Sequence, residues 1–217
     1  MRIAIAGAGK VGRSIAEELA SNGHQVLLMD RDAKIQSIVI EGVTTFQADA
    51  CEVESLSDAD VATCQVIVAA TGDDKTNLVV SLLAKTEFGV PRVIARVNHP
   101  KNEWMFDEAW GVDTAVSTPR MLSALVEEAV SVGDLVRLMT LRKGEANLVE
   151  FTLAPDSDVV GKCVRDVIWP AETTLVCILR EHHVITPTGD DPFESGDELL
   201  FISSSEQENA LLALLRG

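Results

Sequence analysis

The sequence predicts an α/β fold with a doubly wound parallel sheet, followed by a small α+β domain. Three observations predict it. Strand and helix signals alternate six times through about the first 130 residues, which is the pattern of parallel strands covered on both faces by helices. A glycine-rich turn joins the first strand to the first helix, and from residue 135 onward short strands follow one another between Gly and Pro residues. We therefore expect one domain over residues 1–134, and a linker with a second domain over residues 135–217.

The glycine-rich turn follows an apolar strand around Ile3 and Ile5 and opens a helical pattern over Val11–Leu19. In a Rossmann-like G-x-G-x-x-G turn, the first glycine allows the tight bend, the second lets a pyrophosphate approach the backbone, and the third lets the helix pack closely. The helix N-terminus adds free N–H groups and a positive dipole end. Strand, glycines, helix, second strand and acid occur here in the expected order. The turn therefore predicts a nucleotide site at Gly7, Ala8, Gly9, Lys10, Val11 and Gly12.

An acid ends the second apolar run, Val26–Met29. Asp30 lies 18 residues after Gly12, near the spacing at which a carboxylate accepts from a ribose hydroxyl. A carboxylate there favours NAD(H) or an adenine nucleotide over NADP. Arg31 belongs to the same predicted site, and a neighbouring arginine can accommodate a 2′-phosphate, so this preference stays open.

The other elements of the first domain follow in order, each from its apolar periodicity and its flanking turn residues. We expect a helical stretch over Ala33–Ile40, a strand over Thr44–Gln47, a helix over Leu56–Ala59, a strand over Gln65–Ala70, a helix over Asn77–Phe88 that ends at Gly89 and Pro91, a strand over Arg92–Arg96, a helix over Pro100–Trp110, a strand over Asp113–Val116, and a helix from Pro119 through Ala129.

Polar residues stand at the carboxyl ends of several predicted strands, where ligands bind in such sheets. Asp49 and Ala50 follow the third strand, Thr71 and Gly72 follow the fourth, and Arg96 ends the fifth. Asp49 fits a turn residue and a ligand contact equally well. Arg96 is favoured as a phosphate contact, because arginine binds phosphate in a bidentate manner and little else nearby is basic.

Composition limits the function. The net charge is −16 and both halves of the chain are acidic, so neither offers a basic surface for nucleic acid. No apolar stretch reaches the 18 or so residues of a membrane span, and the N-terminal segment lacks a signal-peptide pattern. The four cysteines lack metal-ligand spacing, so we expect reduced structural thiols and a cytoplasmic protein.

A catalytic complement is missing from the pattern. Tyrosine is absent, and His99 is the only plausible acid or base on the ligand side, without a visible orienting partner. His182 and His183 fit a solvated turn better than a metal site. We therefore expect no catalytic residues, and the sequence leaves the question of a metal ion open.

The second domain begins where the regular alternation of strand and helix signals ends. Leu135–Leu141 and Leu148–Leu153, with Gly144 between them, fit either a hairpin or a linker. Before them, an apolar stripe either covers the sheet or packs on another subunit; it comprises Leu122, Leu125, Val126, Ala129 and Val130. The expected elements are strands over Val149–Leu153, Leu175–Arg180, His183–Pro187 and Glu198–Ser203, a helical turn over Val160–Val167, and a helix over Glu206–Leu215.

Over essentially its whole length, the chain resembles the RCK (KTN) regulatory subunits of Trk/Ktr-type potassium uptake systems, the TrkA-like proteins. The resemblance to the N-lobe rests on residues 6–12, Asp30, 47–50, 68–74 with Asn77, and 94–96. The resemblance to the C-lobe rests on residues 160–162, 164–167, 175–180, 184–187 and 196–202.

The resemblance implies a cytosolic subunit, held at the inner face of the membrane by its partner, that controls a potassium pore made by a separate protein. It implies a homo-oligomer, from a dimer to an octameric ring. It also implies NAD(H) or ATP/ADP bound by Gly7 to Val11, Asp30, Thr71, Gly72 and Arg96. Lys10 occupies a position where some members carry an arginine directed at phosphates. Some relatives bind cyclic di-AMP at the C-lobe interface. The alternatives are an NAD-dependent oxidoreductase and a stand-alone nucleotide sensor.

Overall fold

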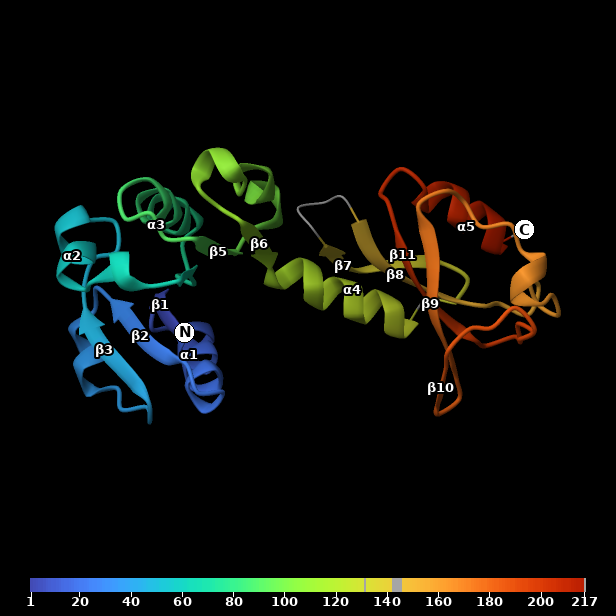
Figure 1. Ribbon diagram of the computed structural model, residues 1–217, viewed down its shortest axis with the longest axis horizontal. Coiled ribbons are helices and arrows are strands. Elements are labelled where there is room, and N and C mark those ends of the chain that lie inside the picture. The colour runs from blue at the N-terminus through green and yellow to red at the C-terminus, as the bar shows by residue number, and fades with distance from the viewer. Residues whose placement is uncertain (131, 142–145, 217) are drawn as a thin grey trace. The chain divides into compact units, whose positions relative to one another are not determined.

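The computed structural model describes residues 1–130, 132–141 and 146–216 of the 217-residue chain (Figure 1). The chain folds as two compact units, Met1–Pro119 and Arg120–Gly217. Helix α4, Thr118–Val130, begins at the end of the first unit and belongs mostly to the second. The boundary between residues 134 and 135, which the sequence predicts between a nucleotide-binding domain and a second domain, remains a proposal.

The first unit is built on a six-stranded parallel sheet with the order β3-β2-β1-β4-β5-β6. Strands β2 and β3 are added on one side of β1, and β4 to β6 are added on the other side. This order is that of a doubly wound sheet and confirms the predicted fold class. The strands are β1 (Arg2–Ala6), β2 (Gln25–Asp30), β3 (Val43–Gln47), β4 (Val66–Ala69), β5 (Arg92–Val97) and β6 (Thr114–Ser117).

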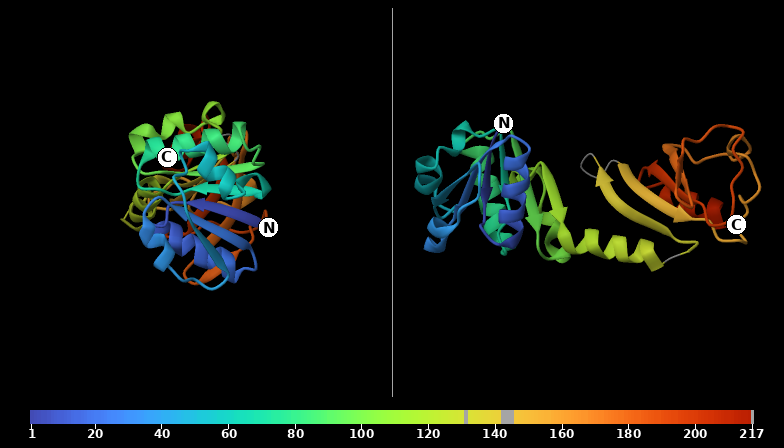
Figure 2. Two further views of the ribbon diagram at one scale, coloured as in Figure 1. Left: turned by 90° about the vertical axis from the view of Figure 1, so that its left-hand side faces the viewer. Right: turned by 90° about the horizontal axis from the view of Figure 1, so that it is seen from below.

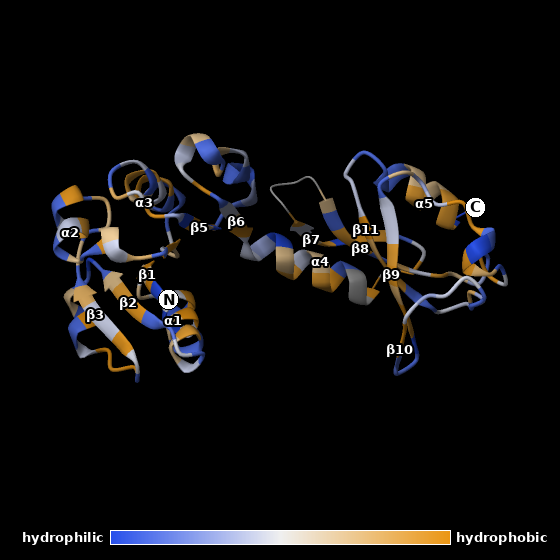
Figure 3. Cartoon of the chain, viewed as in Figure 1, coloured by the Kyte–Doolittle hydropathy of each residue, from blue (hydrophilic) through white to orange (hydrophobic). Residues whose placement is uncertain are grey.

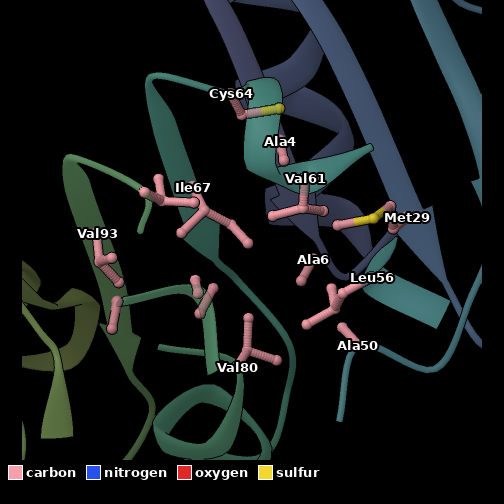
Figure 4. Packing of buried hydrophobic residues seen from close by; sticks show 14 of the residues in the cluster. Ala4, Ala6, Met29, Ala50, Leu56, Val61, Cys64, Ile67, Val80 and Val93 are labelled. Atoms are coloured by element: carbon pink, nitrogen blue, oxygen red, sulfur yellow. The ribbon is translucent and has the colours of Figure 1, made fainter. Parts of the chain in front are cut away.

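Helices cover both faces of this sheet, because the buried parallel strands are apolar on both sides. Helix α1 (Lys10–Ser21) packs on one face, and in the view from below it lies in front of the strands (Figure 2). Helices α2 (Val53–Asp58) and α3 (Asp74–Thr86) pack on the other. Figure 4 shows that second core, where Leu56, Val61 and Val80 point towards side chains of the sheet.

Two expected helices of the first unit are shorter and tighter than predicted. The stretch Ala33–Ile40 forms a 3-10 turn over Ala33–Ser37 and is extended from Ile38, because three successive β-branched residues disfavour a helix. The stretch Pro100–Trp110 forms two 3-10 turns, Pro100–Met105 and Glu108–Trp110. Between them Asp107 is extended and its side chain caps the second turn, which interrupts a continuous helix.

The second unit is an antiparallel five-stranded sheet with the order β10-β9-β11-β8-β7, covered on one face by helix α5 (Glu208–Arg216). This agrees with the predicted α+β domain. Its core includes Trp169, whose ring meets Phe193 edge-on at a centroid distance of 5.9 Å. The strands are β7 (Leu135–Leu141), β8 (Ala146–Thr152), β9 (Thr173–Arg180), β10 (His183–Ile185) and β11 (Glu198–Ser203).

Details of the second unit correct the sequence prediction. Strands β7 and β8 pair antiparallel, so the hairpin alternative is right, although Gly144 between them lies outside the described residues. The helical turn expected over Val160–Val167 is a 3-10 turn limited to Val164–Asp166. Strand β10 ends at Ile185, before Pro187, which lacks the N–H group that a strand ladder needs.

Candidate functional site

A cavity of about 640 Å³ opens at the carboxyl ends of strands β1 to β5. Every residue of the predicted nucleotide site lines it except Ala8 and Gly12. The sheet topology accounts for this convergence, because parallel strands bring all their carboxyl ends to one edge. The lining residues are Gly7, Gly9, Lys10, Val11, Met29, Asp30, Arg31, Ala48, Asp49, Ala50, Cys51, Ala70, Thr71, Gly72, Asp73, Thr76 and Arg96.

The three glycines of the turn are required for different reasons. Gly7 has a φ of +110°, and a Cβ there would lie 2.9 Å from the Thr71 backbone. A Cβ on Gly12 would lie 1.8 Å from the Gly7 carbonyl oxygen, so only glycine lets α1 pack this closely. A Cβ on Gly9 would meet nothing within 4 Å and would project into open space. Gly9 therefore leaves room beside the backbone for a ligand.

The N-terminus of α1 is open to an anion. Gly9 is its N-cap and provides no side-chain acceptor, and the first turn contains no acidic residue. The first N–H groups of a helix have no intrahelical partner and carry the positive end of the helix dipole. Lys10 adds a positive charge at the same place. This end of the cavity is therefore suited to phosphate groups.

Asp30 ties the glycine turn to the end of β2. Its Oδ2 accepts the Ala8 N–H at 2.7 Å, and its Oδ1 accepts the Asp32 N–H at 2.9 Å. The Ala8 N–H therefore fixes the loop, and Ala8 lines the second cavity rather than the first. Each carboxylate oxygen has a further lone pair, so Asp30 can still accept from the hydroxyl groups of a ribose.

A second cavity of about 410 Å³ shares Asp30 and Gly9 with the first. Its lining includes Arg13, Asp32 and Lys34. Lys34 lies 3.6 Å from the Asp32 carboxylate in an exposed ion pair. This cavity thus brings the carboxylates of Asp30 and Asp32 together with two cations, Arg13 and the paired Lys34.

Thr71 and Arg96 also line the main cavity. The Thr71 N–H and hydroxyl both donate to the side chain of Asn77, and the Asn77 amide donates to the Arg96 carbonyl. The Nε of Arg96 is buried without a hydrogen-bond partner, and none of the ion pairs among the described residues involves Arg96. An arginine in this state is suited to an anionic ligand.

Several lining residues were not predicted from the sequence. Met29, Ala48 and Ala70 lie at the carboxyl ends of strands. They could have been predicted, as Asp30 was, from the rule that ligands bind at the carboxyl ends of parallel strands. Asp73 caps α3 by accepting the Thr76 N–H, and this hydrogen bond lowers the pKa of its carboxyl group. Burial raises the pKa of the Cys51 thiol. No spacing signal pointed to Cys51 or Thr76.

The remaining candidates have structural positions. The Nδ1 of His99 accepts the Lys101 N–H at 3.3 Å and so caps the turn that follows. All four cysteines are free thiols, as expected. No group of three His, Cys, Asp or Glu side chains suited to a metal ion occurs among the described residues.

Asp74 anchors the loop that follows β5. The residue is only 7% exposed, and its carboxylate accepts hydrogen bonds from the Asn98 and His99 N–H groups at 2.6 and 3.0 Å. The Asn98 and Asn102 amides donate to it as well. Burial raises the pKa of Asp74, but these hydrogen bonds outweigh it, and the pKa lies below the ordinary 3.8.

We expect Asp74→Asn to lower the free energy of unfolding of the first unit by about 1–3 kcal/mol at neutral pH, because buried donors lose their acceptor. A depressed carboxyl pKa stabilises the fold above the ordinary value and loses this contribution as pH falls through the lowered pKa. Urea unfolding from pH 7 down to pH 3 should therefore show the difference from the wild type shrinking at acid pH. A difference that is constant with pH would contradict this role.

Comparison with known proteins identifies the family. The TrkA-N domain model matches residues 3–118 and the TrkA-C domain model matches residues 148–216. The Trk system potassium uptake protein TrkA of Mycobacterium tuberculosis strain H37Rv is 54% identical over 99% of this chain and 98% of its own. The chain belongs to the TrkA family.

Solved structures agree with the TrkA-family fold. The GsuK channel bound to NAD matches all of this chain and 39% of its own, with a TM-score of 0.68 at 17% identity. The GsuK channel bound to ADP matches 59% of this chain and 34% of its own, with a TM-score of 0.51 at 27% identity. The curated TrkA relatives are named as proteins of a potassium uptake system and not as enzymes, in line with the prediction. No helix in the described part of this TrkA-family chain is long and apolar enough to cross a membrane.

Proposed function

We propose that this chain is the nucleotide-binding regulatory subunit of a Trk-type potassium uptake system. The observation that carries the proposal is its 54% identity to the M. tuberculosis TrkA over nearly the full length of both chains. The subunit lies in the cytoplasm, at the inner face of the membrane, where a separate pore protein holds it. Regulation needs a ligand that binds two conformations of the assembly unequally, and a nucleotide in the main cavity fills that role.

The proposed ligand is NAD(H), or ATP and ADP. Both kinds of molecule combine an adenosine with phosphate groups. Asp30 would accept from the ribose, the N-terminus of α1 and Lys10 would meet the first phosphates, and Arg96 would meet groups farther along the cavity. The NAD-bound and ADP-bound forms of GsuK support these two ligand classes. Cyclic di-AMP at the C-terminal domain is a further ligand to titrate.

We expect NADH to bind at least about 10-fold more tightly than NADPH, a difference of about 1.4 kcal/mol. A 2′-phosphate would face the carboxylates of Asp30 and Asp32, whereas Lys34 is already paired and Arg13 is the second cation of that cavity. Calorimetric titration of both nucleotides measures the ratio. Arg31→Gln is the matched variant: it should weaken NADPH further and leave NADH nearly unchanged. Tighter binding of NADPH by the wild type would contradict the assignment of Asp30.

The proposed assembly is a homo-oligomer, from a dimer to an octameric ring. Hydrophobic segments recur along α4 (Figure 3), and several of its apolar side chains are exposed. Leu122, Leu125, Val126 and Val130 are 60%, 55%, 64% and 77% exposed, which supports packing on another subunit. The side chain of Ala129 lies outside the described residues. A monomeric mass by light scattering at high concentration would contradict this assembly.

Potassium flux through the reconstituted pore partner tests the function directly. We expect flux to change when ATP, ADP, NAD or NADH is titrated in the presence of the chain. The affinity of the nucleotide for the two states of the assembly should differ by about 5–150-fold. Gly9→Val is the matched control, because its side chain would occupy the space beside the helix N-terminus. Flux that no nucleotide changes in the intact complex would contradict the proposal.

A further inference from the structure

Asn77 connects two strand ends beneath the main cavity. Its side chain is fully buried on α3. The Oδ1 atom accepts the Thr71 N–H at 2.9 Å and the Thr71 hydroxyl at 2.6 Å, and the Nδ2 group donates to the Arg96 carbonyl at 2.8 Å. A side-chain amide accepts on one atom and donates from the other. Asn77 therefore binds Thr71 through Oδ1 and Arg96 through Nδ2, which also donates to the Thr71 carbonyl at 3.3 Å.

These bonds continue a connection that the sheet itself does not make. The ladder between β4 and β5 ends at the pair Ala69 and Ala95. Thr71 and Arg96 lie just beyond that pair, and both line the cavity. The Asn77 side chain joins these two backbones directly, and the Asn98 amide adds a second link by donating to the Thr71 carbonyl at 3.0 Å.

The Arg96 side chain depends on this support. Its Nε is buried without a partner, and no carboxylate among the described ion pairs orients the guanidinium group. Its direction is thus set by the backbone from which it projects. That backbone is held by the pairing of Arg96 with Val116 of β6 and, through the Arg96 carbonyl, by the Asn77 amide.

We propose that Asn77 is a positioning residue that directs Arg96 at the phosphate groups of the bound nucleotide. This inference rests on the proposed nucleotide-binding function. Loss of the Asn77 bond to Arg96 should lower the affinity for a ligand in proportion to its number of phosphate groups. A residue that only stabilised the fold would not produce this dependence. Contacts to the adenosine, made by Asp30, should be spared.

The two ends of Asn77 can be separated by substitution. Asn77→Asp keeps the acceptor for Thr71 and loses the donor to Arg96, and Asn77→Ala removes both without burying a charge. We expect each folded variant to bind ATP and ADP about 10-fold or more weakly, which is within the range for a hydrogen bond whose buried partner is left unsatisfied. Adenosine should lose less than about 3-fold. Calorimetric titration with adenosine, AMP, ADP, ATP and NAD provides the series.

Ser81→Ala is the matched control. Ser81 is fully buried one turn farther along α3, donates to the Asn77 backbone carbonyl at 2.7 Å and does not line the cavity. It should leave the dependence of affinity on phosphate number unchanged. The same loss in Ser81→Ala as in Asn77→Ala would mean that disturbance of the helix explains the effect, and would overturn the inference.

A double-mutant cycle with Arg96→Gln decides whether Asn77 acts through Arg96. We expect Asn77→Ala to weaken ATP binding strongly in the wild-type background and only slightly once Arg96 is glutamine. Additive losses, or an equal loss for adenosine and ATP, would overturn the inference and leave the proposed function standing. A wild-type chain that binds no member of the ligand series would overturn both.

Discussion

Replacing Gly12 with alanine unfolds or severely destabilises the first unit. The added Cβ would lie 1.8 Å from the Gly7 carbonyl oxygen, and this oxygen belongs to backbone that cannot give way without moving α1 off the sheet. We expect the free energy of unfolding to fall by about 4 kcal/mol or more, an effect reserved for a few mechanisms of which overpacking is one. Urea unfolding monitored by circular dichroism measures the change.

Gly9→Val is the contrasting substitution in the same turn. A side chain at Gly9 meets open space, so we expect a cost of no more than about 1 kcal/mol for a poorer N-cap. The folded variant should nevertheless lose binding of NAD and ATP, because valine would stand where phosphates approach the helix N-terminus. Wild-type stability of Gly12→Ala, or undiminished nucleotide affinity of folded Gly9→Val, would contradict this reading of the turn.

The second large effect is expected at Arg180 in the second unit. Its guanidinium group donates to both oxygens of Asp197 at 2.7 and 2.8 Å, to the Pro192 carbonyl at 2.8 Å, and to Glu194. The Asp197 side chain is completely buried. Arg180→Met leaves this carboxylate without its charge partner, and we expect a loss of about 3–5 kcal/mol in the free energy of unfolding.

Arg165→Met is the matched control for Arg180→Met. Arg165 pairs with Asp190 in the same unit, but the two side chains are 63% and 80% exposed, so its loss should cost less than about 1 kcal/mol. Adding Asp197→Asn to Arg180→Met should recover part of the stability, because the unpaired charge is removed. Equal unfolding midpoints for Arg165→Met and Arg180→Met would show that burial of an ion pair does not determine how much its loss destabilises the unit.

The sequence predicted the first sheet because its signals are local and redundant. Strand β4 is a short continuous apolar run, which is typical of a parallel strand buried on both faces. The glycine spacing identified the turn into α1 without reference to any distant contact. The edge at which Asp30, Thr71 and Arg96 meet then followed from topology alone. That these residues contact a nucleotide stays a prediction.

What the sequence did not predict depends on contacts between distant residues. Asn77 reaches the carbonyl of a residue 19 positions away, and no periodicity records which atoms its amide will meet. Cys51 enters the cavity through the turn that the Asp49 side chain makes with its N–H group. The helix expected over Ala33–Ile40 is limited to the turn Ala33–Ser37, because the β-branched side chains of Ile38, Val39 and Ile40 are restricted at χ1.

The three tryptophans are divided between the units. Trp104 and Trp110 lie in the first unit and are 77% and 37% exposed, whereas Trp169 is packed among the aromatic rings of the second. Indole emission shifts to longer wavelength when the ring passes from an apolar to an aqueous environment. With Trp104 and Trp110 changed to phenylalanine, the colour of the remaining fluorescence reports on the second unit alone. The chain thus carries an intrinsic optical label by which the melting of one unit can be followed apart from that of the other.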